Sequence, residues 1–132
     1  MKRILTFMFI FLFSGAVFAQ ADSFLCAQFK TGVFAYRDDS SNAVLINRSV
    51  TRQEEHIKKS GIVTKFKIRW ITDCSYEIKQ VWSNSKTRRK ANGSTTTVVI
   101  TNAGKDQYEY SCACNPADDG RKSGGTVYRV PE

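Results

Sequence analysis

The sequence predicts an all-β protein, an antiparallel up-and-down barrel or half-barrel of about eight strands, with a β-sandwich as the alternative. Three observations predict it: polar and apolar residues alternate along many short runs, turn-forming residues separate these runs, and no run of ten or more residues carries a clear helical stripe. Because the connections are short, neighbouring runs should pair as antiparallel hairpins. Their shared apolar face must then be buried by curling or by folding over.

The clearest alternation is Ile62–Trp70, in which every second residue from Ile62 suits a core and the residues between them are basic. Similar runs give the other expected strands, which are Phe29–Arg37, Ala43–Ser49, Gln53–Lys59, Tyr76–Trp82, Thr95–Thr101, Gln107–Cys114 and Thr126–Val130. Residues 51–59 are also rich in helix formers, so a helix there is the local alternative. A strand is favoured because Ile57 alone could anchor such a helix to a core.

Residues 1–19 have the pattern of a secretory signal peptide, with Lys2 and Arg3 before an apolar run and small residues before a cut after Ala19. The apolar run, Ile4 to Phe13, is shorter than the roughly 20 residues that span a bilayer, so no membrane span is expected. We therefore expect a secreted or periplasmic monomer with a single β domain over residues 20–132.

Four cysteines, Cys26, Cys74, Cys112 and Cys114, lie in the exported part and predict disulfides. A zinc site is not expected, because Cys-Ala-Cys is not a zinc knuckle and His56 is distant in sequence; no other metal or cofactor is expected either. If Cys112 and Cys114 share one strand, their Cβ vectors run parallel with Cα atoms roughly 6.5 Å apart. Long-range links from Cys26 and Cys74 into this last strand pair are therefore favoured among the three pairings.

The chain carries a formal net charge of +8, and loss of Lys2 and Arg3 with the signal peptide would leave +6. Such a charge favours anionic partners. Two basic clusters supply the candidate anion-binding residues, Lys65, Lys67, Arg69, Arg88, Arg89 and Lys90. The alternative is a solvated face that keeps an edge strand from aggregating. Nucleic acid is not expected as a partner, because a secreted chain seldom meets it and the aromatic residues are placed for core packing.

Polar residues also interrupt the inward pattern around the second expected turn. Arg48 shares a face with Ile46, and Gln53 shares a face with Glu55 on the next strand. If both faces look inward, a charged pair lies in the barrel mouth, where it either orients a ligand or forms a structural ion pair. With His56 as the sole imidazole and no base beside a nucleophile, the sequence predicts no enzyme.

One resemblance covers most of residues 26–114. It rests on the spacings Cys26-x-x-Phe29-Lys30-Thr31-Gly32-x-Phe34-x-Tyr36, Ile46-x-Arg48 with Gln53-x-Glu55, Ile68-x-Trp70-Ile71-Thr72-Asp73-Cys74-x-Tyr76 and Tyr110-x-Cys112. In these the chain resembles a group of small exported bacterial β proteins of unknown function, whose architecture is similar to the lipocalin-like (calycin-type) barrels. The resemblance implies a shared fold and supplies no catalytic residue.

The expected function is that of a secreted, non-catalytic binding protein for a small hydrophobic ligand or lipid, held in the barrel mouth. Its candidate ligand-binding residues are Tyr36, Arg48, Glu55, Phe66, Trp70 and Tyr110. The alternative is a surface-interaction protein whose basic residues bind an anionic polysaccharide, lipopolysaccharide or acidic protein. A cavity among the aromatic residues favours the first, whereas a core packed solid removes it.

Overall fold

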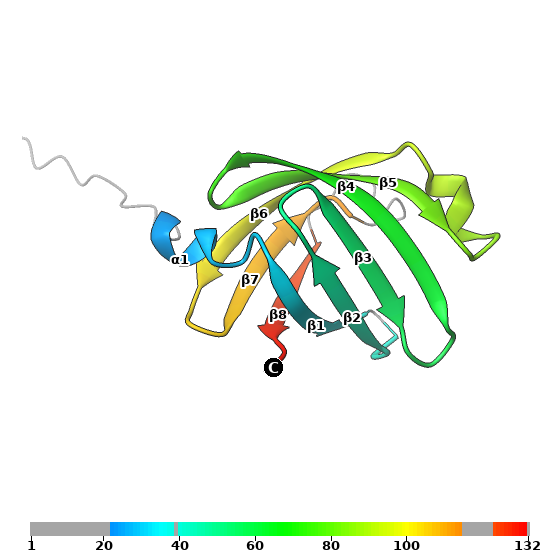
Figure 1. The fold of residues 1–132 in the computed structure, drawn as a ribbon, viewed down its shortest axis with the longest axis horizontal. Coiled ribbons are helices and arrows are strands. Elements are labelled where there is room, and N and C mark those ends of the chain that lie inside the picture. The colour runs from blue at the N-terminus through cyan, green and yellow to red at the C-terminus, as the bar shows by residue number, and fades with distance from the viewer. Residues whose placement is uncertain (1–21, 39, 115–122, 132) are drawn as a thin grey trace, which may run out of the picture.

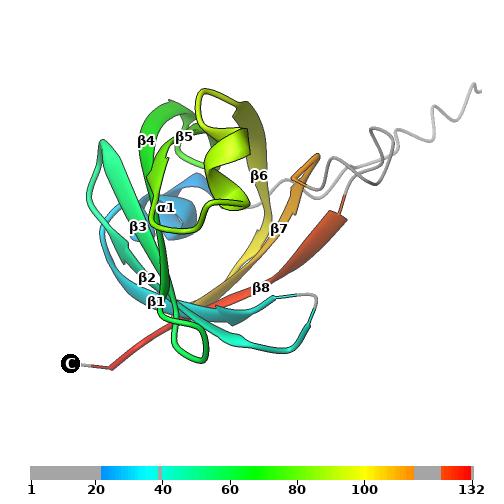
Figure 2. The same ribbon diagram turned by 90° about the vertical axis from the view of Figure 1, so that its right-hand side faces the viewer.

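The computed structural model describes residues 22–38, 40–114 and 123–131, whose strands form a closed antiparallel barrel. Strand order follows chain order, and the last strand pairs with the first through Phe34 opposite Arg129. Figure 1 shows the tilted strands from the side, and Figure 2 shows the ring they form. The strands of this described part are β1 (Gly32–Arg37), β2 (Ala43–Arg48), β3 (Arg52–Ile57), β4 (Ile62–Thr72), β5 (Ser75–Ser83), β6 (Thr95–Ala103), β7 (Gln107–Cys112) and β8 (Ser123–Arg129). The prediction of an up-and-down barrel is confirmed, in its closed form rather than as a half-barrel or sandwich.

The predicted strands are all present, with ends that shift by a few residues. The first begins at Gly32 rather than Phe29, because Phe29, Lys30 and Thr31 form a turn that follows a short helix. The seventh ends at Cys112 instead of Cys114. Residues 52–57, for which a helix was the alternative, form strand β3.

Strand β4 has the alternation that its sequence predicts. Thr64 and Ile68 are buried, whereas Lys65, Lys67 and Arg69, at the alternate positions, are exposed. A residue of one face follows a residue of the other because successive side chains of a strand point to opposite sides of the sheet. In a closed barrel those sides are the interior and the outer surface.

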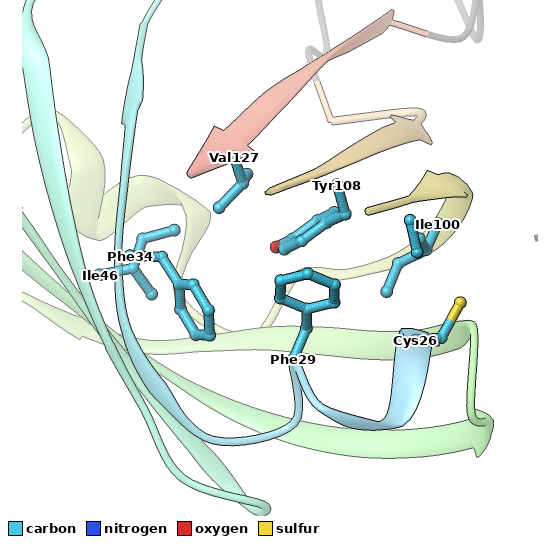
Figure 3. Close-up of a cluster of buried hydrophobic side chains, with 8 residues drawn as sticks. Cys26, Phe29, Phe34, Ile46, Ile100, Tyr108 and Val127 are labelled. Carbon is cyan, nitrogen blue, oxygen red and sulfur yellow. The ribbon is translucent and has the colours of Figure 1, made fainter. Parts of the chain in front are cut away.

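One end of the barrel is closed by the N-terminal helix α1 (Ser23–Ala27) and the turn after it. Asp22 caps the helix by accepting a hydrogen bond from the Phe24 backbone N–H at 2.9 Å. Phe29 enters the barrel, where its ring centroid lies 6.0 Å from that of Phe34 and 4.9 Å from that of Tyr108. Figure 3 shows these rings meeting at the centre of the main buried cluster. The packed rings fill this end of the barrel and border the open space beyond them.

The disulfide pairing differs from the prediction. Cys26 pairs with Cys74, whose Cα atoms are 5.1 Å apart, and Cys112 pairs with Cys114. The first bond tethers α1 to the turn between β4 and β5. The prediction was wrong because it placed Cys112 and Cys114 in one extended strand, whereas β7 ends at Cys112 and the two Cα atoms are 5.2 Å apart, closer than in an extended strand.

The proposed signal peptide, residues 1–19, lies outside the described residues. The domain bounds and the monomeric state stay predictions. Within residues 22–38, 40–114 and 123–131, no helix has the length and apolar character needed to cross a membrane.

Candidate functional site: the barrel cavity

The barrel contains a cavity of about 530 Å³ between the buried ring cluster and the 3₁₀ helix η1 (Arg88–Ala91). Helices α1 and η1 lie toward opposite ends of the barrel, as Figure 1 shows, so the cavity opens away from the closed end. Strands all around the barrel contribute apolar side chains to its wall, among them Ile46, Phe66, Ile78, Val98 and Val127. Polar side chains project into the same space, namely Tyr36, Arg48, Gln53, Glu55, Gln80 and Arg88.

A chain of hydrogen bonds connects four of these polar side chains. Arg48 Nε donates to Gln53 Oε1 at 2.7 Å, and Gln53 Nε2 donates to Glu55 Oε1 at 2.7 Å. The Tyr36 hydroxyl donates to Glu55 Oε2 at 3.1 Å. The register of β2 and β3 brings them together, since Arg48 lies opposite Gln53 and the alternation points both inward. Arg48 and Glu55 are therefore linked through a bridging amide rather than by direct contact.

Arg48 makes several hydrogen bonds to groups inside the barrel. Besides its bond to Gln53, its guanidinium donates to the Phe29 carbonyl at 3.0 Å and to the hydroxyls of Tyr76 at 3.2 Å and Tyr108 at 2.8 Å. Its central carbon also lies 5.1–5.7 Å from the rings of Phe34, Tyr76 and Tyr108. A guanidinium has five N–H donors, and these contacts use most of them. Arg48 therefore has little hydrogen-bonding capacity left for a ligand.

Glu55 keeps more of its capacity free for a ligand. Each carboxylate oxygen accepts one hydrogen bond, whereas an ionised carboxylate offers about four acceptor sites. Burial raises the pKa of Glu55, although the hydrogen bonds from Gln53 and Tyr36 and the positive charges of Arg48 and Arg88 oppose this rise. Burial, followed by the nearby Glu55 carboxylate, also raises the pKa of Tyr36, so its hydroxyl stays a donor. The pair presents both an acceptor and a hydroxyl to the cavity.

The mouth of the cavity is bordered by η1, which one inward side chain holds in place. Gln80 Nε2 donates to the Arg88 carbonyl at 2.6 Å and to Asn92 Oδ1 at 2.9 Å. Gln80 is 8% exposed and projects from β5 into the barrel. The two bonds position η1 so that Arg88 and Ala91 line the mouth.

Five of the six residues predicted from the sequence to bind a ligand line this cavity. They are Tyr36, Arg48, Glu55, Phe66 and Tyr110. Trp70, the sixth, packs instead against the ring of Tyr76 at 4.6 Å between centroids, with the Lys30 ammonium 5.4 Å from its own ring. Sequence reasoning missed Gln80, Tyr76 and Tyr108, although Tyr76 and Gln80 share the inward face of one alternating run.

The predicted anion-binding residues differ in their surroundings. Lys65 pairs with Glu54 at 3.2 Å and Arg69 with Glu77 at 2.7 Å on the outside of the barrel. Arg88 lines the cavity mouth, while Arg89 and Lys90 are exposed on η1. Lys67 is exposed and has no salt bridge among the described residues.

Among the described residues, no three His, Cys, Asp or Glu side chains are grouped as a metal site requires. His56, the single histidine of the chain, lies on β3 outside the cavity lining, with its Nε2 2.6 Å from Glu54 Oε1. Comparisons with protein-family models, with curated proteins and with solved structures gave no match. The geometry of the cavity and of the outer surface is therefore the basis for inferring a function.

Proposed function

We propose that this protein is a non-catalytic binding protein of an exported compartment that holds a small amphipathic molecule in its barrel cavity. The observation that carries the proposal is the cavity, because its volume of about 530 Å³ falls within the ~300–1,000 Å³ typical of small-molecule sites. Such sites combine an apolar wall with a few converging polar groups, and this one does so.

The lining favours a ligand with a hydrogen-bonding head and an apolar body. Glu55 and Tyr36 form the part of the polar network with acceptor capacity left, and both line the cavity. Other residues that line the cavity, such as Ile78 and Val98, are apolar. A hydroxyl or amine that donates to Glu55 satisfies the carboxylate, while burial of the body removes apolar surface from water.

The position of His56 outside the cavity supports a binding role without catalysis. Hydrolytic catalysis needs a nucleophile within hydrogen-bond reach of a base. The imidazole of His56 bonds to Glu54 away from the cavity, and the cavity carboxylate of Glu55 bonds to an amide and a phenol. The predicted signal peptide and the disulfides support an exported location.

The test combines native mass spectrometry with a cavity-filling variant. The protein purified from its natural source under native conditions is expected to carry a small molecule that denaturation releases. Purified ligand-free protein is then titrated with Nile red, an uncharged dye that fluoresces in apolar sites. Thr96→Phe, which places a ring in the cavity from β6, should weaken dye binding at least roughly tenfold, because the ring occupies space that the dye needs.

Thr97→Phe is the matched control, because Thr97 is the next residue of β6 and is exposed on the outer face. It should leave dye binding unchanged. Thermal melts of both variants show whether the barrel is intact. Absence of any bound molecule together with equal dye binding by wild type, Thr96→Phe and Thr97→Phe would contradict the proposal.

A further inference from the structure

The strand register places three cations in one row across the outside of the barrel. Arg52 of β3 lies opposite Lys67 of β4, and Lys67 lies opposite Lys79 of β5. All three are exposed. Directly opposite residues of antiparallel strands have Cα atoms roughly 4.5–5.5 Å apart, so the row extends about 10 Å perpendicular to the strands. We refer to Arg52, Lys67 and Lys79 as the cation row.

The cation row is not neutralised, although the rows beside it are. On one side Lys65 pairs with Glu54, and on the other Arg69 pairs with Glu77. No salt bridge involves Arg52, Lys67 or Lys79 in the part of the chain that the structure describes. Like charges directly opposite each other destabilise a sheet. The barrel therefore retains an unfavourable arrangement that a bound anion would relieve.

Protection of an edge strand does not explain the cation row. Lysines on a sheet edge keep that edge from pairing with another chain. Strands β3, β4 and β5 are each paired on both sides within a closed barrel, so none of them is an edge. Edge protection therefore does not account for three adjacent cations on the face of the sheet.

The surroundings of the cation row suit a sugar polymer. A hollow of about 610 Å³ borders the row, and Arg52 and Lys67 line it together with the Lys65–Glu54 pair. At its other end the row continues into Thr95 of β6, opposite Lys79, and Thr97 follows on the same exposed face. Adjacent cations and hydroxyls match the anionic esters and hydroxyls of an acidic glycan.

We propose that the cation row binds closely spaced sulfate or phosphate esters of an acidic polysaccharide. Nucleic acid is less well matched, because single strands bind by stacking bases on open aromatic rings. Trp82, an exposed aromatic residue opposite Lys65 on β5, has the Lys65 ammonium 5.4 Å from its ring centroid. The glycan site is separate from the barrel cavity and does not depend on it.

The experiment uses heparin, a sulfated polysaccharide, as the probe and titrates the full-length protein at several salt concentrations. Arg52→Gln/Lys67→Gln/Lys79→Gln should weaken heparin binding roughly thirtyfold, at about threefold for each exposed charge contact. The slope of log affinity against log salt should decrease by about three, one for each cation lost. The charge-matched control is Lys58→Gln/Lys59→Gln/Lys105→Gln, at exposed turn positions, which should retain most of the affinity.

A second pair of variants tests the hydroxyls. Thr95→Val/Thr97→Val keeps the β-branched shape, so the strand should persist, and it should weaken heparin binding about threefold. Thr101→Val, farther along the exposed face of β6, should not. Unchanged affinity in Thr95→Val/Thr97→Val would overturn the assignment to a glycan.

Three other results would also overturn the proposal. Equal loss of heparin affinity in both triple variants would mean that net charge alone attracts the polymer. Unchanged affinity in the cation-row triple would mean that the row is not the site. Tighter binding of poly-glutamate or single-stranded DNA than of heparin would mean that the partner is not a glycan. Thermal melts and Nile red binding should be intact in the cation-row triple, which separates this outcome from failure of the cavity proposal.

Discussion

At the scale of single residues, Arg48 holds the barrel interior together. It is 6% exposed and donates hydrogen bonds to side chains or carbonyls from β3, β5, β7 and the turn after α1. A buried charge is tolerated when its donors are satisfied and another charge lies near, and Glu55 supplies the negative charge through Gln53. The same contacts make the interior sensitive to loss of this one side chain.

Arg48→Met should lower the free energy of unfolding by about 3–5 kcal/mol. It leaves the Gln53 amide oxygen, the Phe29 carbonyl and the Tyr76 and Tyr108 hydroxyls without their buried donor, and it removes a positive charge that acts on Glu55. Urea unfolding measures the change. Arg89→Met on exposed η1 is the control and should change stability by less than about 0.5 kcal/mol. A loss below about 1 kcal/mol for Arg48→Met would contradict this assignment.

Glu55 should give stability a distinctive dependence on pH. Its pKa is raised in the folded protein by burial, so the folded state retains a proton that the unfolded state releases near the ordinary value of 4.5. The free energy of unfolding therefore falls as pH rises from about 4.5 through the higher folded pKa, and then levels. Asp38 and Glu54, whose pKa values are lowered, act in the opposite sense at lower pH.

The difference between wild type and Glu55→Gln isolates this contribution, since Asp38 and Glu54 are common to both. Urea unfolding across a pH series should show wild type losing stability relative to Glu55→Gln as pH rises above about 4.5. Parallel pH profiles of the two proteins would show that the carboxyl titrates alike in the folded and unfolded states.

Part of the polar network is predictable from the sequence alone. The period-two pattern places Arg48, Gln53 and Glu55 on inward faces, which the structure confirms. It cannot identify Tyr108 as a partner of Arg48, because the two are 60 residues apart and meet only across the closed barrel. Contacts across the barrel interior depend on closure of the barrel, which a local sequence pattern does not predict.

At the scale of elements, the strands were predictable because each buries one face of an alternating run. The short helices were not. Helix α1 has five residues and η1 has four, too few for a helical period to be visible. Each is fixed by contacts outside itself, α1 by the disulfide to Cys74 and η1 by the two bonds from Gln80. These tertiary contacts decide how each end of the barrel is built.

Pairing of elements also explains why the prediction for the basic clusters was incomplete. Lys65, Lys67 and Arg69 look equivalent along β4, but their cross-strand neighbours differ. Lys65 and Arg69 face carboxylates, whereas Lys67 faces Arg52 and Lys79. A single strand gives the face of each residue, and only the register gives its partner. The sequence therefore does not reveal Arg52 and Lys79 as parts of one cation row.

At the scale of the whole molecule, charge and burial are divided between two surfaces of one sheet. The interior contains the cavity, with Arg48 linked to Glu55 through Gln53. The outer surface carries much of the excess positive charge of a chain whose formal net charge is +8. Because alternation assigns successive residues to opposite surfaces, each can be altered separately. This separation is what allows Thr96 and Thr97, neighbours in sequence, to serve as variant and control.

The two disulfides should contribute very differently to the stability of the whole barrel. Cys26–Cys74 joins residues 48 apart, for which loop-closure entropy gives about 4 kcal/mol, whereas Cys112–Cys114 joins residues 2 apart and gives about 1–2 kcal/mol. Urea unfolding of Cys26→Ser/Cys74→Ser should therefore show a loss larger by about 2–3 kcal/mol than that of Cys112→Ser/Cys114→Ser. Equal losses, or the reverse order, would contradict the expectation that the longer loop closed by Cys26–Cys74 lowers the entropy of the unfolded chain more.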